Sequence, residues 1–104
     1  MIFDWSEQKN QELFDKRGVC FEDVIEAVAN GLVLDILAHH NSNKYPQQSI
    51  IVVRIRAYVY YVPFVEDRVK ETIFLKTIIP SRKLTAKYRW YILRESDHEH
   101  WQTI

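Results

Sequence analysis

The chain has 104 residues, of which 47% are hydrophobic and 13% aromatic, with two glycines and three prolines. This composition excludes disordered, collagen-like and low-complexity proteins, because enough apolar surface is present to offset the entropy of the chain. A single domain spanning 1–104 is expected, since the length suits one domain and no linker or internal repeat interrupts it. One cysteine excludes an internal disulfide framework.

A cytoplasmic location without membrane insertion is expected. The apolar runs are much shorter than the roughly 20 residues that a membrane-spanning helix needs. The opening segment MIFDWSEQKN carries acidic and polar residues where a secretory signal needs basic and then apolar ones.

The formal charges cancel at pH 7, but they are unevenly distributed along the chain. Residues 1–35 contain eight acids and three bases, whereas residues 76–94 contain six bases and no acid. This asymmetry predicts one surface that attracts phosphate and an acidic helical end that faces away from it. Charge balancing between neighbouring elements is the alternative interpretation.

Two helices are predicted in the first third of the chain. Residues 6–17 form a polar helix that Ser6 or Asp4 could cap and that Gly18 ends. In the second helix, Cys20 occupies the N-cap, where serine would be expected, and Gly31 ends the run. Its buried face follows the i, i+3, i+4, i+7 spacing of Phe21, Val24, Ile25 and Val28.

Four strands and a third helix are predicted after Gly31. The strands are expected at 32–38, 50–55, 58–65 and 72–79, with joins short enough for antiparallel hairpins. Pro63 should lie at an edge or a bulge, and Pro80 should end the last strand. Ser81 can cap a helix whose buried stripe comprises Leu84, Tyr88, Tyr91 and Ile92.

The expected fold class is therefore α+β, with two N-terminal helices, a small and mainly antiparallel four-stranded sheet, and one C-terminal helix. Residues 95–104 form an unassigned tail.

A basic stripe is predicted on the third helix. Lys83, Lys87, Trp90 and Arg94 are spaced i, i+4, i+7 and i+11, so they share one helix face. Such a stripe suits phosphate contacts and stacking on a base, and these residues are candidates for RNA binding. The alternative is a solvated surface without a ligand.

Basic residues also occur on the predicted strands. Arg54 and Arg56 share the parity of Val52, so both are expected on one face of the sheet, where they could clamp a phosphate. Lys76 is expected to project from the open face of the sheet or to lie at its edge. The arginines could equally form cross-strand ion pairs with Glu66, Asp67 or Glu71.

No metal or cofactor is expected. One cysteine and two scattered histidine pairs do not fit a structural zinc site, and the chain has no nucleotide-binding loop or nucleophile elbow. His39 and His40 in the loop could transfer protons near neutral pH, or they could be ordinary surface residues.

Two segments resemble the BrnT-type ribonuclease toxins of type II toxin–antitoxin modules. They are FDWSEQKNQELFDKRGVCFEDV at 3–24 and LKTIIPSRKLTAKY at 75–88. The resemblance implies a RelE-like fold and metal-independent endoribonuclease activity that inhibits translation and growth. It also implies neutralisation by a cognate DNA-binding antitoxin, through which alone the module would reach operator DNA.

The resemblance also suggests roles for individual residues. Arg82 matches the family's arginine at the end of the last strand, and Lys83 matches the basic position after it. Arg82 is also expected at a helix N-terminus, where backbone amides favour an anion. We expect Arg82 to stabilise the charge that develops on the phosphate, together with Lys76 and Arg54, which are chosen from charge and strand parity alone and not from the resemblance. Proton transfer is assigned to Tyr88, His39 or His40.

The chain departs from the family pattern at several positions. Leu13 stands where the family often has Asn, Arg17 where it often has His, and Cys20 where it often has Ser. The family's Glu-Arg pair is replaced by the segment Gln47-Gln48-Ser49. These departures support an alternative function: a catalytically weak or inactive module of the toxin fold that binds an antitoxin and acts in operon regulation.

Overall fold

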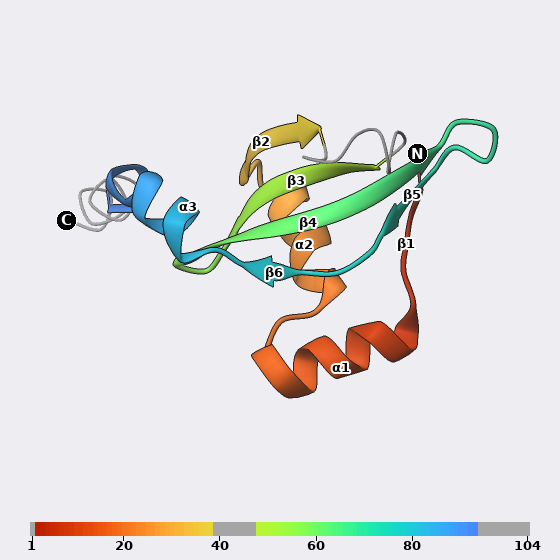
Figure 1. Ribbon diagram of the computed structural model, residues 1–104, viewed down its shortest axis with the longest axis horizontal. Helices are drawn as coiled ribbons and strands as arrows, with labels where there is room; N and C mark the ends of the chain where they lie inside the picture. Colours follow the sequence, from red (N-terminus) through yellow and green to blue (C-terminus); the bar gives the residue numbers. More distant parts are fainter. Residues whose placement is uncertain (1, 39–47, 94–104) are drawn as a thin grey trace.

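The computed structural model describes residues 2–38 and 48–93 and has an α+β fold, as predicted (Figure 1). Residues 89–93 are again helical after α3. The elements in chain order are β1 (Ile2–Asp4), α1 (Glu7–Arg17), α2 (Phe21–Ala29), β2 (Val33–Ala38), β3 (Gln48–Ile55), β4 (Tyr58–Asp67), β5 (Thr72–Leu75), β6 (Ile79–Pro80) and α3 (Arg82–Lys87).

The two N-terminal helices are confirmed, and local capping explains their ends. Ser6 rather than Asp4 caps α1, because its side chain accepts a hydrogen bond from the Lys9 amide at 3.2 Å. Gly18 ends α1 with a φ of 70°, a left-handed conformation that favours glycine. Cys20 is the N-cap of α2, and its amide donates to the Asp23 carboxylate.

Asn10 joins α1 to α2. Its side chain is buried, with 7% exposure, which is unusual for a polar residue. The amide oxygen accepts from the Phe21 backbone amide at 2.7 Å, and the amide nitrogen donates to Glu22 at 2.7 Å. Both halves of the side-chain amide are therefore satisfied, and the angle between the two helices is fixed at their junction.

The sheet is larger than predicted, with six strands instead of four among residues 2–38 and 48–93. Its order is β1-β5-β4-β3-β2, and β6 pairs with β4. All pairings are antiparallel except that of β1 with β5. The sequence pattern did not reveal β1, because three residues are too few for a strand period.

The predicted strand 72–79 is also corrected, because it divides into β5 and β6 around Pro63. Phe64 pairs with Leu75 and Tyr61 pairs with Ile79, so residues 62–63 of β4 face the three residues 76–78. The extra residue makes this a bulge, in agreement with one of the two positions expected for Pro63.

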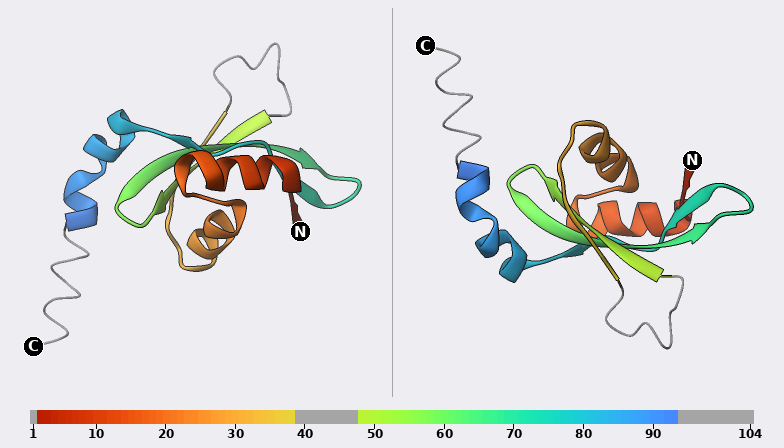
Figure 2. Two further views of the ribbon diagram at one scale, coloured as in Figure 1. Left: turned by 90° about the horizontal axis from the view of Figure 1, so that it is seen from below. Right: turned by 90° about the horizontal axis from the view of Figure 1, so that it is seen from above.

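Apolar side chains pack on both faces of the sheet. On one face, Phe21 and Val24 of α2 pack with Val53, in a cluster to which Leu13 of α1 also belongs. Alternating residues of the same strands form a second cluster, in which Val52 and Val59 pack with Ile92. Figure 2 shows α1 and α2 on one side of the sheet, with α3 beyond its end.

The predicted buried stripe of the third helix is only partly correct. Ile92 is buried, and Leu84 and Tyr88 are half-buried against the second cluster, but Tyr91 is 36% exposed. Among the residues described, no helix is long and apolar enough to cross a membrane.

Candidate anion-binding cleft beside the β3–β4 turn

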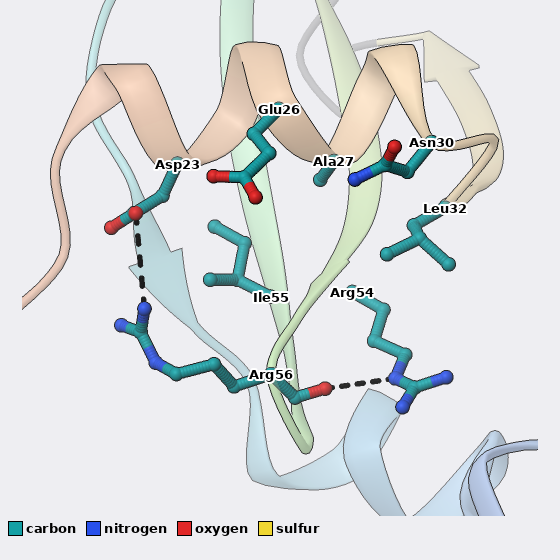
Figure 3. Close-up of a pocket in the computed structure, with 8 residues that line it drawn as sticks. All are labelled: Asp23, Glu26, Ala27, Asn30, Leu32, Arg54, Ile55 and Arg56. Atoms are coloured by element: carbon teal, nitrogen blue, oxygen red, sulfur yellow. Dashed lines mark hydrogen bonds and ion pairs between the residues drawn. The ribbon is translucent and has the colours of Figure 1, made fainter. Parts of the chain in front are cut away.

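The turn between β3 and β4 carries two of the predicted site residues. Ile55 pairs with Tyr58, so Arg56 and Ala57 form a two-residue turn. Arg56 has a φ of 58°, in the left-handed region that disfavours residues with a side chain. Its carbonyl accepts a hydrogen bond from Nε of Arg54 at 2.8 Å (Figure 3). The two arginines therefore contact each other through the turn itself.

Arg56 is held against the N-terminal helices. Its guanidinium donates to the Gly18 carbonyl at 3.1 Å and lies 3.8 Å from the Asp23 carboxylate. Arg56 is thus outside the strand and does not share a sheet face with Arg54 as predicted. The predicted ion pairs with Glu66, Asp67 or Glu71 are wrong for Arg56, because its acidic partner is on α2. The register places Arg54 opposite Val59, at the other end of β4 from those acids.

Acidic side chains face these arginines across a small polar pocket of about 130 Å³. Figure 3 shows the carboxylates of Asp23 and Glu26 directed from α2 toward the turn. The expectation that the acidic helical end faces away from the basic surface is therefore wrong at this point. Carboxylates beside Arg54 and Arg56 weaken the attraction of this pocket for phosphate.

A larger cleft of about 380 Å³ lies on the other side of the turn. It includes Arg82, the main predicted catalytic residue, together with Arg89, and both are exposed. Neither guanidinium forms a hydrogen bond or an ion pair with any residue among 2–38 and 48–93. The cleft is lined by Ala57, Tyr58, Arg82, Thr85, Ala86, Arg89, Ile92 and Leu93.

Hydrogen bonds to β4 position the cleft arginines. The Ser81 amide donates to the Val59 carbonyl at 2.9 Å, and the Val59 amide donates to Oγ1 of Thr85 at 2.9 Å. Thr85 in turn donates to the Ser81 carbonyl at 2.7 Å. These bonds fix the first turn of α3 against the strand and thereby set the place of Arg82.

The expected contribution of a helix N-terminus to anion binding at Arg82 is not supported. Helix α3 has six residues, and the Ser81 side chain already accepts from the Leu84 amide at 3.1 Å. A short helix has a weak dipole, and a capped amide has no free proton to offer. Among the described lining residues, the positive charge available to an anion comes from the guanidinium groups of Arg82 and Arg89.

The other predicted cations lie outside the cleft lining. Lys76 lies between β5 and β6, not on a strand, with its Nζ 5.5 Å from the centre of the Phe74 ring. Lys83 and Lys87 are exposed on α3, and Nζ of Lys87 lies 5.5 Å from the Tyr88 ring. Of these three residues, Arg54 lines the smaller pocket, Arg82 lines the larger cleft, and Lys76 lines neither of these two cavities.

The predicted basic stripe is interrupted at its middle. Helix α3 ends at Lys87, Tyr88 is its C-cap, and the chain is helical again from 89. Trp90 is 62% exposed, and the centre of its ring lies 6.2 Å from the centre of the Tyr91 ring. Three predicted residues, His39, His40 and Arg94, lie outside the described part of the chain.

Sequence reasoning missed Arg89, Thr85 and Tyr58. Arg89 follows Arg82 by seven residues, a spacing that puts both on one face of a helix. That signal was present, but the neighbouring stripe from Lys83 contains more charged residues. Thr85 and Tyr58 gave no signal, because their part in the cleft depends on the contact between α3 and β4.

Among the ionisable groups near the turn, Tyr60 has a shifted pKa. Burial raises the pKa of Tyr60 above its usual value of 10.0, so its hydroxyl is protonated at neutral pH. Its ring lies 5.5 Å from that of Tyr58 in an edge-to-face arrangement. Within the described ranges, no group of three or more His, Cys, Asp and Glu side chains is placed to hold a metal ion.

Comparison with known proteins gives no relative for this chain. No family model matches it, and neither does a curated protein or a solved structure. The α+β class is thus taken from the structure itself, while the resemblance to BrnT-type toxins depends on the two sequence segments.

Proposed function

We propose that the chain is the toxin of a type II toxin–antitoxin module and that it binds and cleaves RNA, without a metal, at the cleft beside the β3–β4 turn. One observation carries the proposal. Arg82 and Arg89 line one cleft, and neither is neutralised by another described residue. The two segments that resemble BrnT-type toxins support the choice of RNA as the anion.

The proposed reaction is an attack by the RNA 2′-oxygen on the adjacent phosphorus. The new O–P bond forms as the bond to the 5′-oxygen breaks, which leaves a 2′,3′-cyclic phosphate and a 5′-hydroxyl. Negative charge grows on the phosphoryl oxygens, and Arg82 and Arg89 would stabilise it through charge-assisted hydrogen bonds. Neither arginine would transfer a proton, because guanidinium stays protonated in proteins.

Proton transfer needs another hydroxyl or a residue beyond the described ranges. Tyr58 lines the cleft, whereas Tyr88 packs against the second apolar cluster. Thr85 is engaged with Val59 and Ser81. Tyr58 is therefore our candidate among the described lining residues, and it replaces Tyr88 in that role.

The proposed antitoxin would neutralise the toxin by covering the cleft. A DNA-binding partner would need carboxylates for Arg82 and Arg89 and apolar side chains for the exposed Leu93 and Trp90 beside them. Operator DNA would then be contacted by the antitoxin and not by this chain.

The test is cleavage of a defined, ribosome-free RNA by the purified chain in EDTA. We expect cyclic 2′,3′-phosphate ends with the wild type and no cleavage by the Arg82→Ala, Arg89→Ala double variant. Arg68→Ala, Lys70→Ala is the matched control, because it also removes two positive charges, at the far β4–β5 turn (Figure 1). RNA binding that is unchanged in the double variant would contradict the assignment of the cleft.

A second function is favoured by the chemistry of the lining. No carboxylate or imidazole is present among the described residues that line the cleft. A module that binds RNA or an antitoxin without cleaving RNA therefore remains the alternative. Tight, arginine-dependent RNA binding with no cleavage would support that module and exclude the nuclease.

A further inference from the structure

The lining of the cleft that contains Arg82 and Arg89 suits a ligand with an apolar part as well as a phosphate group. A phosphate is polar on all sides and needs only hydrogen-bond donors. Here the two guanidinium groups share the cleft with apolar walls from Ala57, Ala86 and Ile92. A ligand that combines an anion with an apolar, flat body matches this lining better than a bare anion does.

We infer that the cleft holds one unpaired nucleobase of single-stranded RNA, with the neighbouring phosphate on Arg82 and Arg89. The inference rests on the proposed function, and it adds which form of RNA is bound and what the apolar part of the cleft contacts. The volume of about 380 Å³ is at the small end of the range for small-molecule sites, which suits a single nucleotide.

The walls explain how a base would be bound. Aliphatic side chains cover the face of a base that has left its stack, and a guanidinium plane can lie flat against its ring. Arg82 begins α3 and Arg89 follows the interruption at Tyr88, and both line the same cleft. Both guanidinium groups can donate to the phosphate, and the plane of one of them can also lie against the base.

Duplex RNA cannot use this cleft without losing a base pair. A paired base is stacked on both faces, and its removal from the duplex costs a few kilocalories per mole. Because every 1.4 kcal/mol is a factor of ten, we expect duplex RNA to bind at least about tenfold more weakly than the same strand alone.

The test distinguishes the contribution of the base to binding from that of the phosphate. A ten-nucleotide RNA, its duplex, and an abasic ribose-phosphate oligomer of equal length are compared by fluorescence anisotropy at one salt concentration. Ala86→Leu narrows the cleft without touching either arginine, and leucine is a good helix former. Ala29→Leu, on the exposed end of α2, is the matched control.

We expect Ala86→Leu to weaken binding of the single strand by about tenfold or more, down to the level of the duplex and the abasic oligomer. Its binding of the duplex and of the abasic oligomer should not change, which also shows that the variant is folded. Ala29→Leu should bind all three like the wild type.

Two other results would overturn the inference in distinguishable ways. Equal affinity for strand, duplex and abasic oligomer, lost only with Arg82 and Arg89, would exclude the base site and leave the proposed RNA-binding function in place. RNA binding that does not depend on the two arginines would overturn both proposals.

Discussion

The backbone amide of Val59 donates a hydrogen bond to Oγ1 of Thr85, 2.9 Å away, and so attaches the first turn of α3 to the start of β4. Val59 has no exposed surface, so water cannot replace this acceptor. Together with the bond from the Ser81 amide to the Val59 carbonyl, Thr85 therefore sets how Arg82 on α3 lies relative to the β3–β4 turn.

Thr85→Val should lower the free energy of unfolding by about 1–3 kcal/mol, because it leaves the buried Val59 amide without an acceptor. Thr85→Ser keeps the oxygen and should lose less. Urea titration monitored by tryptophan fluorescence measures both. A valine variant as stable as the wild type would show that the bond contributes little.

Arg56 should show the cost of its backbone conformation. Both Arg56→Gly and Arg56→Ala remove the contacts with Gly18 and Asp23, but only glycine relieves the φ of 58°. We expect the glycine variant to be more stable than the alanine variant by about 1 kcal/mol. Thermal unfolding of the pair checks this, and equal stabilities would exclude strain at the turn.

The contact between Asn10 and Glu22 should make stability depend on pH. The hydrogen bond from Asn10 lowers the pKa of Glu22 below its usual 4.5. The stabilisation that this hydrogen bond gives the folded protein is therefore complete above about pH 4.5. It is lost as the pH falls through the lower pKa that Glu22 has in the folded state.

Asn10→Ala should accordingly destabilise the protein more at pH 7 than at pH 3. At pH 3 a loss of about 1–3 kcal/mol should remain, because the Phe21 amide still lacks its acceptor. Urea titrations at the two pH values provide the comparison, and an NMR titration should show the pKa of Glu22 rising toward 4.5 in the variant. A pH-independent difference would argue against this assignment.

Replacement of Cys20 by serine should stabilise the folded protein. A serine oxygen is a better acceptor for the first amides of α2 than sulfur is, so Cys20→Ser should raise the free energy of unfolding by about 0.5–1 kcal/mol. Cys20→Ala is the control and should not stabilise the protein. Differential scanning calorimetry resolves these differences, and a serine variant that melts below the wild type would refute the expectation.

RNA binding should weaken as salt rises. Each phosphate contact on a single strand adds about 0.7 to the slope of log affinity against log salt. Arg82→Ala and Arg89→Ala should each reduce that slope by about this amount, whereas Lys70→Ala should leave it unchanged. Titrations at four salt concentrations test the prediction, and an unaltered slope in both arginine variants would place the phosphate elsewhere.

The helices α1 and α2 and the hairpin of β3 and β4 were predictable because their signals are local. Gly18 marks a helix end, and the runs of β-branched residues on either side of Arg56 indicate paired strands. Lys76 was misplaced because the bulge depends on which residues of β4 face it. That pairing joins segments more than ten residues apart, so it produces no periodic pattern in the sequence.

The cleft was only partly predictable. The resemblance indicates Arg82 as a catalytic residue, and strand parity indicates Arg54. The structure puts the two on opposite sides of the β3–β4 turn. The sequence analysis does not predict Arg89 as a site residue, although its seven-residue spacing from Arg82 can be read from the sequence. What joined it to Tyr58 was the packing of α3 on β4, a tertiary contact that charge patterns along the chain cannot show.

The pairing of β1 with β5 also bears on how the protein folds during synthesis. Ile2 and Asp4 lie opposite Thr72 and Phe74, so this edge of the sheet joins residues that are about 70 positions apart in the chain. Contacts of such sequence separation slow folding, because a long loop must close before they form. Strand β1 therefore has no partner in the sheet until residues 72–74 have left the ribosome, and only then can this edge of the sheet form.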